Sequence, residues 1–160
     1  TPPVFPCVLK SISSFVAQAK GESPEVAFMS CVAAVETAAD KLSALTWRVL
    51  SRKRGSEADD PTLIRHLYDL AALEEEVASN KDFSSLVKIL LEKDAGRGKP
   101  REDIQKMEIL DQVREALRIL ETDPEYVVEY DRFVLGMSYA PKQPSFQDAI
   151  QAAYRIVASI

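Results

Sequence analysis

The sequence is poor in the residues that build metal sites and disulfide frameworks. Its 160 residues include only two Cys and one His. Cys7 and Cys31 lack metal-ligand spacing and lie among apolar neighbours, so we expect buried free thiols. This composition argues against a zinc site, and a reducing, cytoplasmic setting fits the cysteine usage best.

Long apolar runs and a leader sequence are also missing. No stretch approaches about 18 consecutive apolar residues, so no segment is predicted to span a membrane. The first residues contain neither a basic nor an apolar region of the kind found in signal peptides. They lack an initiator Met as well, so we expect a processed product or a piece cut from a longer protein.

The charge balance restricts the partners that the chain can bind. The sequence has 20 Lys and Arg against 25 Asp and Glu, a net charge of −5. A chain with this balance is not a general nucleic-acid binder, because contacts with phosphates need clustered cations. A local basic patch remains possible.

Helical periodicity dominates the rest of the sequence, which has only five Gly. We expect a mainly α fold, a bundle-like array of about six helices with one short strand. The strand is predicted near residues 26–32, and because no second strand of equal quality is evident, its partner is expected outside this chain. Helices are predicted over residues 9–19, 36–53, 62–78, 81–94, 101–121, 123–135 and 145–158.

The chain divides at about residue 34. Residues 1–34 form an N-terminal segment with one helix and the short strand, and residues 35–160 form a helical domain. Asp60 is expected to cap the helix that follows it. Ser145 and Asp148 are expected to form a capping box after a turn bracketed by Pro141 and Pro144.

Lys41 is the first candidate for chemistry. It lies on a helix stripe with Ala38, Leu45 and Arg48, at the border of the apolar face. Such a lysine either extends its ammonium to water or directs it into a cleft, where it can pair with phosphate oxygens. Spacing alone favours the first interpretation.

The second candidate is the run Arg65-His66-Leu67-Tyr68-Asp69. Arg65 and Asp69 are four positions apart on a predicted helix, which favours an intrahelical ion pair. His66 and Tyr68 would then be half-buried side chains with hydrogen-bonded tips. Alternatively, Asp69 binds metal or acts as a base, and Arg65 orients it or holds a phosphate.

A third group consists of four cations, Arg48 and Arg52 to Arg54, within seven positions. Cations suit the end of a helix, so a solvated helix terminus is the simplest interpretation. A phosphate contact is the sharper alternative.

These residues carry a resemblance to a known family. The segments ETAADKLSALTWR and RHLYDLAAL resemble the Lys-bearing helix and the following Asp-bearing helix of AbiEii/AbiGii-type nucleotidyltransferase toxins, which belong to type IV toxin–antitoxin and abortive-infection systems. The tail EYDRF…MSYAPKQPSFQDAIQAA resembles the closing pattern of the family. The similarity extends from about residue 29 to residue 160.

The resemblance implies binding of a nucleoside triphosphate and transfer of a nucleotidyl group to RNA, with tRNA as the expected acceptor. Lys41 would contact the triphosphate, with Arg48 and Arg65 as further phosphate-binding residues. Asp69 would be the acidic residue of the site, and His66 and Tyr68 would support it. An antitoxin is the expected partner.

One family motif is absent from residues 1–160, the Gly-Ser turn with its metal-binding Asp. We therefore expect no metal ligands within this chain, and Mg²⁺ to be held by an N-terminal nucleotidyltransferase domain outside it. The chain would then be the C-terminal helical half of a larger enzyme and inactive alone. The alternative is a non-catalytic helical protein-interaction domain.

Overall fold

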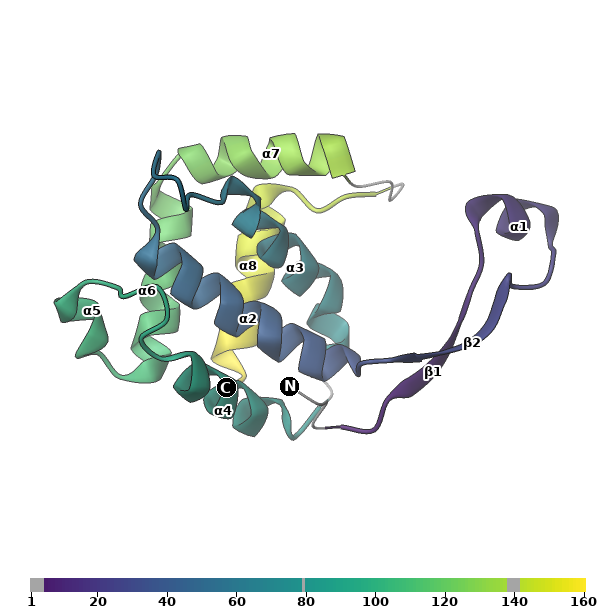
Figure 1. Cartoon of the computed structure of the whole chain (residues 1–160), viewed down its shortest axis with the longest axis horizontal. Coiled ribbons are helices and arrows are strands. Elements are labelled where there is room, and N and C mark those ends of the chain that lie inside the picture. Colours follow the sequence, from purple (N-terminus) through teal and green to yellow (C-terminus); the bar gives the residue numbers. More distant parts are fainter. Residues whose placement is uncertain (1–4, 79, 138–141) are drawn as a thin grey trace.

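The computed structural model describes residues 5–78, 80–137 and 142–160, so Pro141 lies outside the described residues. Within these ranges the fold is mainly α, as predicted, with eight α-helices, one 3₁₀ helix and a two-stranded sheet (Figure 1). The elements are β1 (Val8–Ile12), α1 (Phe15–Lys20), β2 (Val26–Cys31), α2 (Ala34–Ser51), η1 (Pro61–Ile64), α3 (Arg65–Ala78), α4 (Phe83–Asp94), α5 (Glu102–Gln105), α6 (Ile109–Thr122), α7 (Glu125–Met137) and α8 (Phe146–Ala158).

Helix α2 is the central element of the helical body. Its apolar side chains recur at helical spacing, and Ala38, Leu42, Leu45 and Val49 are almost completely buried. This face packs against α3, α4 and α6, while α8 packs against α3 and α6 and α7 lies on η1. Residues from α2 and every later helix join one core, which fixes the position of each side chain at the surface of α2.

The N-terminal segment differs from the prediction. The strand near residue 26 is present as β2, but its partner lies within this chain. It is β1, in antiparallel register with Val8 opposite Cys31 and Lys10 opposite Met29. The helix predicted over residues 9–19 is therefore wrong in its first half. Apolar residues at positions 9 and 12 fit either structure, and the unpaired backbone groups of β2 decide in favour of a strand.

The two strands form an arm that projects from the helical body, with α1 at its far end (Figure 1). The arm exposes large apolar side chains, and Leu9 and Phe28 are 65% and 78% accessible. The prediction of buried thiols is wrong here, because Cys7 is exposed and Cys31 is only partly buried; both are free.

Several helix limits also differ from the predicted ones. The segment expected as one helix over residues 101–121 is split into α5 and α6, because Met107 N–H bonds the Ile104 carbonyl three residues back and closes α5. The helix expected from residue 62 begins with the 3₁₀ helix η1. Asp60 caps η1 as predicted, since its carboxylate accepts a hydrogen bond from Thr62 N–H at 3.0 Å. No helix in the described ranges is long and apolar enough to cross a membrane.

The predicted capping box at the start of α8 is confirmed. Ser145 Oγ accepts from Asp148 N–H at 3.1 Å, and the Asp148 carboxylate accepts from Ser145 N–H at 3.1 Å. Two backbone donors that the helix leaves unpaired are thereby satisfied.

We predict that Ser145→Ala lowers the free energy of unfolding by about 1 kcal/mol, because it removes the acceptor for the Asp148 amide. This corresponds to a fall in Tm of roughly 2–4 °C for a chain of this size. Gln147→Ala, at the exposed second position of the same helix, is the matched control and should leave Tm unchanged. Equal Tm values for the two variants would contradict the role of the cap.

Candidate functional site

Lys41 and Asp69 are brought into direct contact by the packing of α2 against α3. Lys41 Nζ lies 2.8 Å from Asp69 Oδ2, and the two side chains are 26% and 34% exposed. The ion pair of Asp69 is thus an interhelical one with Lys41, and Arg65, four positions earlier, donates instead to Thr62 Oγ1 at 3.1 Å. The predicted intrahelical pair of Arg65 with Asp69 is replaced by a contact that joins two helices.

His66 lies beneath this surface. The imidazole is 6% exposed, and neither ring nitrogen has a hydrogen-bond partner among the described residues. Burial, followed by the positive charges of Lys41, Arg65 and Arg48, lowers the pKa of His66 to about 4. The expectation of a half-buried His66 with a bonded tip is therefore wrong, and at neutral pH the ring is uncharged.

Arg48 is held two turns further along α2 by the residues that start η1. Its Nη1 lies 2.9 Å from Asp60 Oδ2. Burial raises the pKa of Asp60, but hydrogen bonds from Thr62 and the charges of Arg48 and Arg65 outweigh it, so that the pKa is lowered. Arg48, Asp60, Thr62 and Arg65 form a continuous polar chain beside Lys41 and Asp69.

Tyr68 serves the packing of the helices on the aromatic side of α3. Its ring lies 5.8 Å from the ring of Phe133 and 6.4 Å from that of Tyr130, measured between centroids. Tyr130 and Tyr126 are buried, so these aromatic side chains belong to the core. Tyr68 thus connects the site helix α3 to α7.

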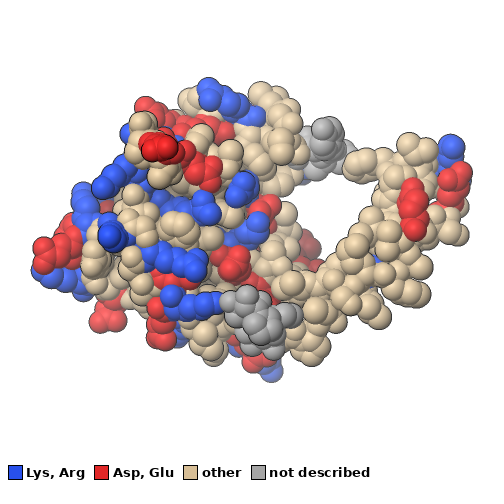
Figure 2. Space-filling model, in the orientation of Figure 1, with Lys and Arg blue, Asp and Glu red and all other residues tan. Residues whose placement is uncertain are grey.

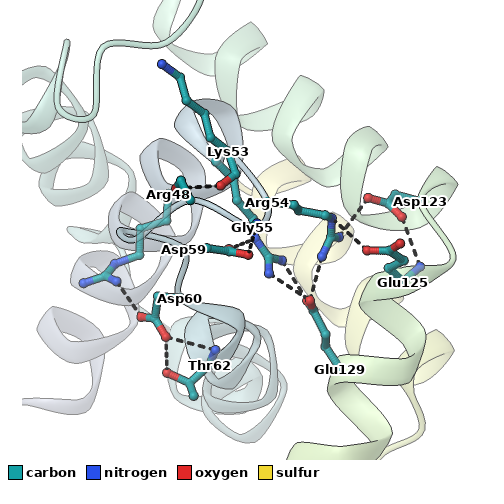
Figure 3. A network of polar contacts seen from close by, with 12 residues as sticks. Arg48, Lys53, Arg54, Gly55, Asp59, Asp60, Thr62, Asp123, Glu125 and Glu129 are labelled. Atoms are coloured by element: carbon teal, nitrogen blue, oxygen red, sulfur yellow. Dashed lines mark hydrogen bonds and ion pairs between the residues drawn. The ribbon is translucent and has the colours of Figure 1, made fainter.

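The end of α2 carries a second polar cluster, shown in Figure 3. The Arg52 side chain is 5% exposed and binds Glu129 through both terminal nitrogens, at 2.7 and 2.8 Å, and Asp59 through Nε at 2.8 Å. Arg54 reaches Glu129 at 2.6 Å and Asp123 at 2.8 Å. Both guanidinium groups also lie over the ring of Tyr126. We call these residues the Arg52 cluster.

The expectation of a solvated helix terminus is therefore wrong for Arg52, whereas Arg54 is exposed but paired with carboxylates. Their acidic partners come from the linker before η1, from the junction of α6 and α7 and from α7, up to 77 positions away in the sequence. Among these acids, only Asp59 is close enough in the sequence to the cations for a contact to be predicted from its spacing. Lys53, in contrast, is exposed and extends away from the cluster (Figure 3).

The described residues contain no group of three or more His, Cys, Asp and Glu side chains that could hold a metal ion. At the Lys41 site the carboxylate is that of Asp69. The residues that the structure describes here therefore do not form a metal site of the kind that nucleotidyl transfer requires; they offer cations, the carboxylates of Asp69 and Asp60 paired with them, and a neutral imidazole.

The fold and the site define a helical protein that presents paired charges on two adjoining helices. A family model described as "Nucleotidyl transferase AbiEii toxin, Type IV TA system" matches residues 1–152. The chain belongs to this AbiEii family of nucleotidyltransferase toxins. The match covers nearly the whole chain, so it begins well before residue 29, where the sequence resemblance was placed. Neither the curated proteins nor the solved structures gave a match.

Removing the buried guanidinium should test the Arg52 cluster. Arg52→Met leaves the largely buried carboxylate of Glu129 with one cation fewer. We expect a loss of about 3 kcal/mol in the free energy of unfolding, measured by urea denaturation. Lys53→Met, at the neighbouring exposed position, should change stability by less than about 0.5 kcal/mol. A small loss for Arg52→Met would show that the cluster does not hold the linker.

The neutral His66 should make stability depend on pH. Its folded pKa of about 4 lies below the unfolded value of about 6.5, so the unfolded state takes up the proton first. The free energy of unfolding should therefore fall by about 2 kcal/mol between about pH 7 and pH 5. His66→Leu should lose this dependence. As the chain has one His, its NMR titration gives the folded pKa directly, and a value near 6.5 would contradict the burial.

Proposed function

We propose that this chain provides the helical side of a nucleotidyltransferase site, with Lys41 binding the triphosphate of a nucleoside triphosphate. The observation that carries the proposal is the contact of Lys41 with Asp69, which places the two residues of the family resemblance 2.8 Å apart. Membership of a nucleotidyltransferase family supports the reaction class. Such enzymes use nucleoside triphosphates and divalent metal ions.

Lys41 is suited to a phosphate because it is a partly exposed cation next to further cations. Arg48 and Arg65 lie on the same surface, and all three charges act on the buried His66. We propose that Arg48 and Arg65 help to hold the phosphates. Each is held by a hydrogen bond, Arg48 to Asp60 and Arg65 to Thr62. The guanidinium groups are therefore oriented before a ligand arrives.

Asp69 is proposed as the catalytic carboxylate of this side of the site. When a phosphate group replaces Asp69 as the partner of Lys41, the Asp69 carboxylate becomes able to accept a proton or a hydrogen bond from the attacking hydroxyl. His66 and Tyr68 are proposed as supporting residues. His66 keeps a neutral ring beneath the cations, and Tyr68 fixes α3 against the aromatic side chains of α7.

Mg²⁺ is proposed to be held outside this chain, by the carboxylates of an N-terminal nucleotidyltransferase domain. The surface we assign to that domain is the arm of β1 and β2, because an isolated two-stranded ribbon is marginally stable in water. Its exposed apolar residues would be covered on docking. On this proposal residues 1–34 act as the docking segment and residues 35–160 as the site-bearing helical domain.

The proposed acceptor is the end of an RNA, with tRNA as the first choice, in the cytoplasm. Type IV toxin–antitoxin membership implies an antitoxin as partner. The exposed arm also supports a second candidate function, a non-catalytic helical domain that binds another protein through its apolar strands.

The two functions are separated by Lys41→Ala and Asp69→Asn in the full-length protein. Losing one charge-assisted contact to the transition state should reduce nucleotide transfer to tRNA about 100- to 1000-fold. Stability should change by at most about 1 kcal/mol, since the ion pair is partly exposed. Transfer is measured with labelled nucleoside triphosphates and Mg²⁺, and stability by thermal melting. Lys106→Ala, which removes a similar but fully exposed ion pair with Glu102, is the matched control.

A charge exchange makes this test sharper. The double variant Lys41→Asp with Asp69→Lys keeps an ion pair between α2 and α3 but moves the cation to the other helix. If the pair serves only packing, the double variant should regain full activity. We expect transfer to stay at the level of the single variants, because the triphosphate meets the wrong charge. Full activity in all three variants would favour the interaction domain.

A further inference from the structure

A groove runs along the end of α2 where the loop between α4 and α5 crosses it. One hollow, of about 370 Å³, is lined by Trp47, Arg48, Lys53 and Gly98 among others. An adjoining hollow of about 500 Å³ is lined by Lys53, Lys99, Arg101 and neighbouring residues. The two hollows adjoin, since Ser51, Arg52 and Lys53 line both, and we call them together the groove.

The groove carries an excess of positive charge in a chain whose net charge is negative. Lys53 and Lys99 are exposed, and neither forms an ion pair with another described residue. Arg101 is 73% exposed and has only a surface contact with Asp103. Arg52 and Arg54 in the floor are already engaged by carboxylates. Figure 2 shows Lys and Arg interspersed with Asp and Glu over the helical body, whereas the arm carries few charges, most of them near its tip.

The wall of the groove adds hydrogen-bond donors without acceptors. Trp47 Nε1 and Arg48 Nε are buried and have no partner among the described residues. Both atoms can only donate, and Asp60, an acid in the same wall, is engaged by Arg48 and Thr62. Because both atoms are shielded from solvent, a ligand in the groove meets the exposed cations Lys53, Lys99 and Arg101, and a ligand that complements these is negatively charged.

The loop that supplies Lys99 is held in one conformation. Gly98 has φ +71°, and a Cβ at this position would lie 2.2 Å from Ser51 Oγ, so only glycine allows the loop to approach α2 so closely. Lys99 follows with φ 52°, a left-handed conformation that is uncommon for residues with a Cβ. Such a conformation persists where the surrounding structure holds it. The cation is therefore presented from a fixed backbone.

The groove is placed next to the Lys41 site. Arg48, at the edge of the groove, is two turns from Lys41 on the same stripe of α2, which is roughly 10 Å along the helix axis. A nucleic-acid strand whose end lies at Lys41 would reach the groove within a few nucleotides.

We propose that this groove binds the phosphodiester backbone of the RNA acceptor, with Lys53, Lys99 and Arg101 as phosphate contacts. The proposal rests on the proposed function for the choice of RNA among polyanions. An elongated depression with several separated cations suits a chain of phosphates better than one compact phosphate group. Contacts of this kind hold any sequence, because they do not reach the bases.

Binding of a fluorescein-labelled single-stranded RNA to the chain, measured by anisotropy over a range of salt concentrations, tests the groove. The triple variant Lys53→Gln, Lys99→Gln, Arg101→Gln should bind about tenfold or more weakly at low salt. Three lost phosphate contacts should also reduce the slope of log K against log salt by about 2. The matched control is Lys81→Gln, Lys88→Gln, Arg132→Gln, which removes the same charge at exposed positions that line neither hollow. It should bind like the parent, and all variants should melt alike.

Equal binding by the two triple variants would overturn the proposal, as would no RNA binding by the parent chain at low salt. Competition experiments distinguish RNA from other negatively charged ligands. Nucleoside triphosphates or polyglutamate that displace RNA from the parent at equal phosphate or carboxylate concentration would also overturn the assignment to RNA.

The outcomes for the groove and for the proposed function are distinguishable. If the groove fails while Lys41→Ala still abolishes transfer, the function stands and RNA binds elsewhere. If transfer is absent but RNA binding depends on the three cations, the groove stands without the enzyme.

Discussion

The buried guanidinium of Arg52 is the contact on which the arrangement of the site depends. It joins three segments that are distant in the sequence: the end of α2, the linker before η1 through Asp59, and α7 through Glu129. A buried arginine is stable only when its donors are matched by carboxylates, so the geometry of these segments is tightly specified. Once Asp59 is fixed, Asp60 follows it directly, and Asp60 both holds Arg48 and starts η1. The position of α3, and with it Asp69, depends on that start.

Three cations in or next to α2 are each paired with an acid from another part of the chain. Lys41 is neutralised from α3, Arg48 from the linker, and Arg52 from the linker and α7. Burial, followed by the charges of Lys41, Arg65 and Arg48, lowers the pKa of His66, so at neutral pH the ring adds no further positive charge beside these cations. The positive and negative charges of the site are therefore closely spaced and nearly balanced. The excess of positive charge lies in the neighbouring groove.

Local patterns in the sequence were sufficient for the helical body. Periodicity predicted the helices from α2 to α8 within a few residues, except that α5 and α6 were expected as one helix. The cap at Asp60 and the capping box at Ser145 follow from short-range hydrogen bonds. The contact of Lys41 with Asp69 could be expected from two consecutive helices joined by a short linker. Local sequence patterns gave wrong predictions where the structure depends on a residue that is distant in the sequence. Residues 8–12 have helical spacing but pair with β2, and Arg52 is buried because Glu129, 77 positions away, meets it.

The ion pair of Lys41 with Asp69 means that any anion arriving there takes part in an exchange. The ammonium is already bonded at 2.8 Å, so the newcomer must displace a carboxylate of this chain before it gains the same contact. The net free energy is the difference between two ion pairs, which disfavours weak monovalent anions and favours ligands that bring several charged oxygens. The same displacement sets Asp69 free at the moment when the ligand is seated. Occupancy of the cation and availability of the Asp69 carboxylate are thereby coupled through a single ion pair.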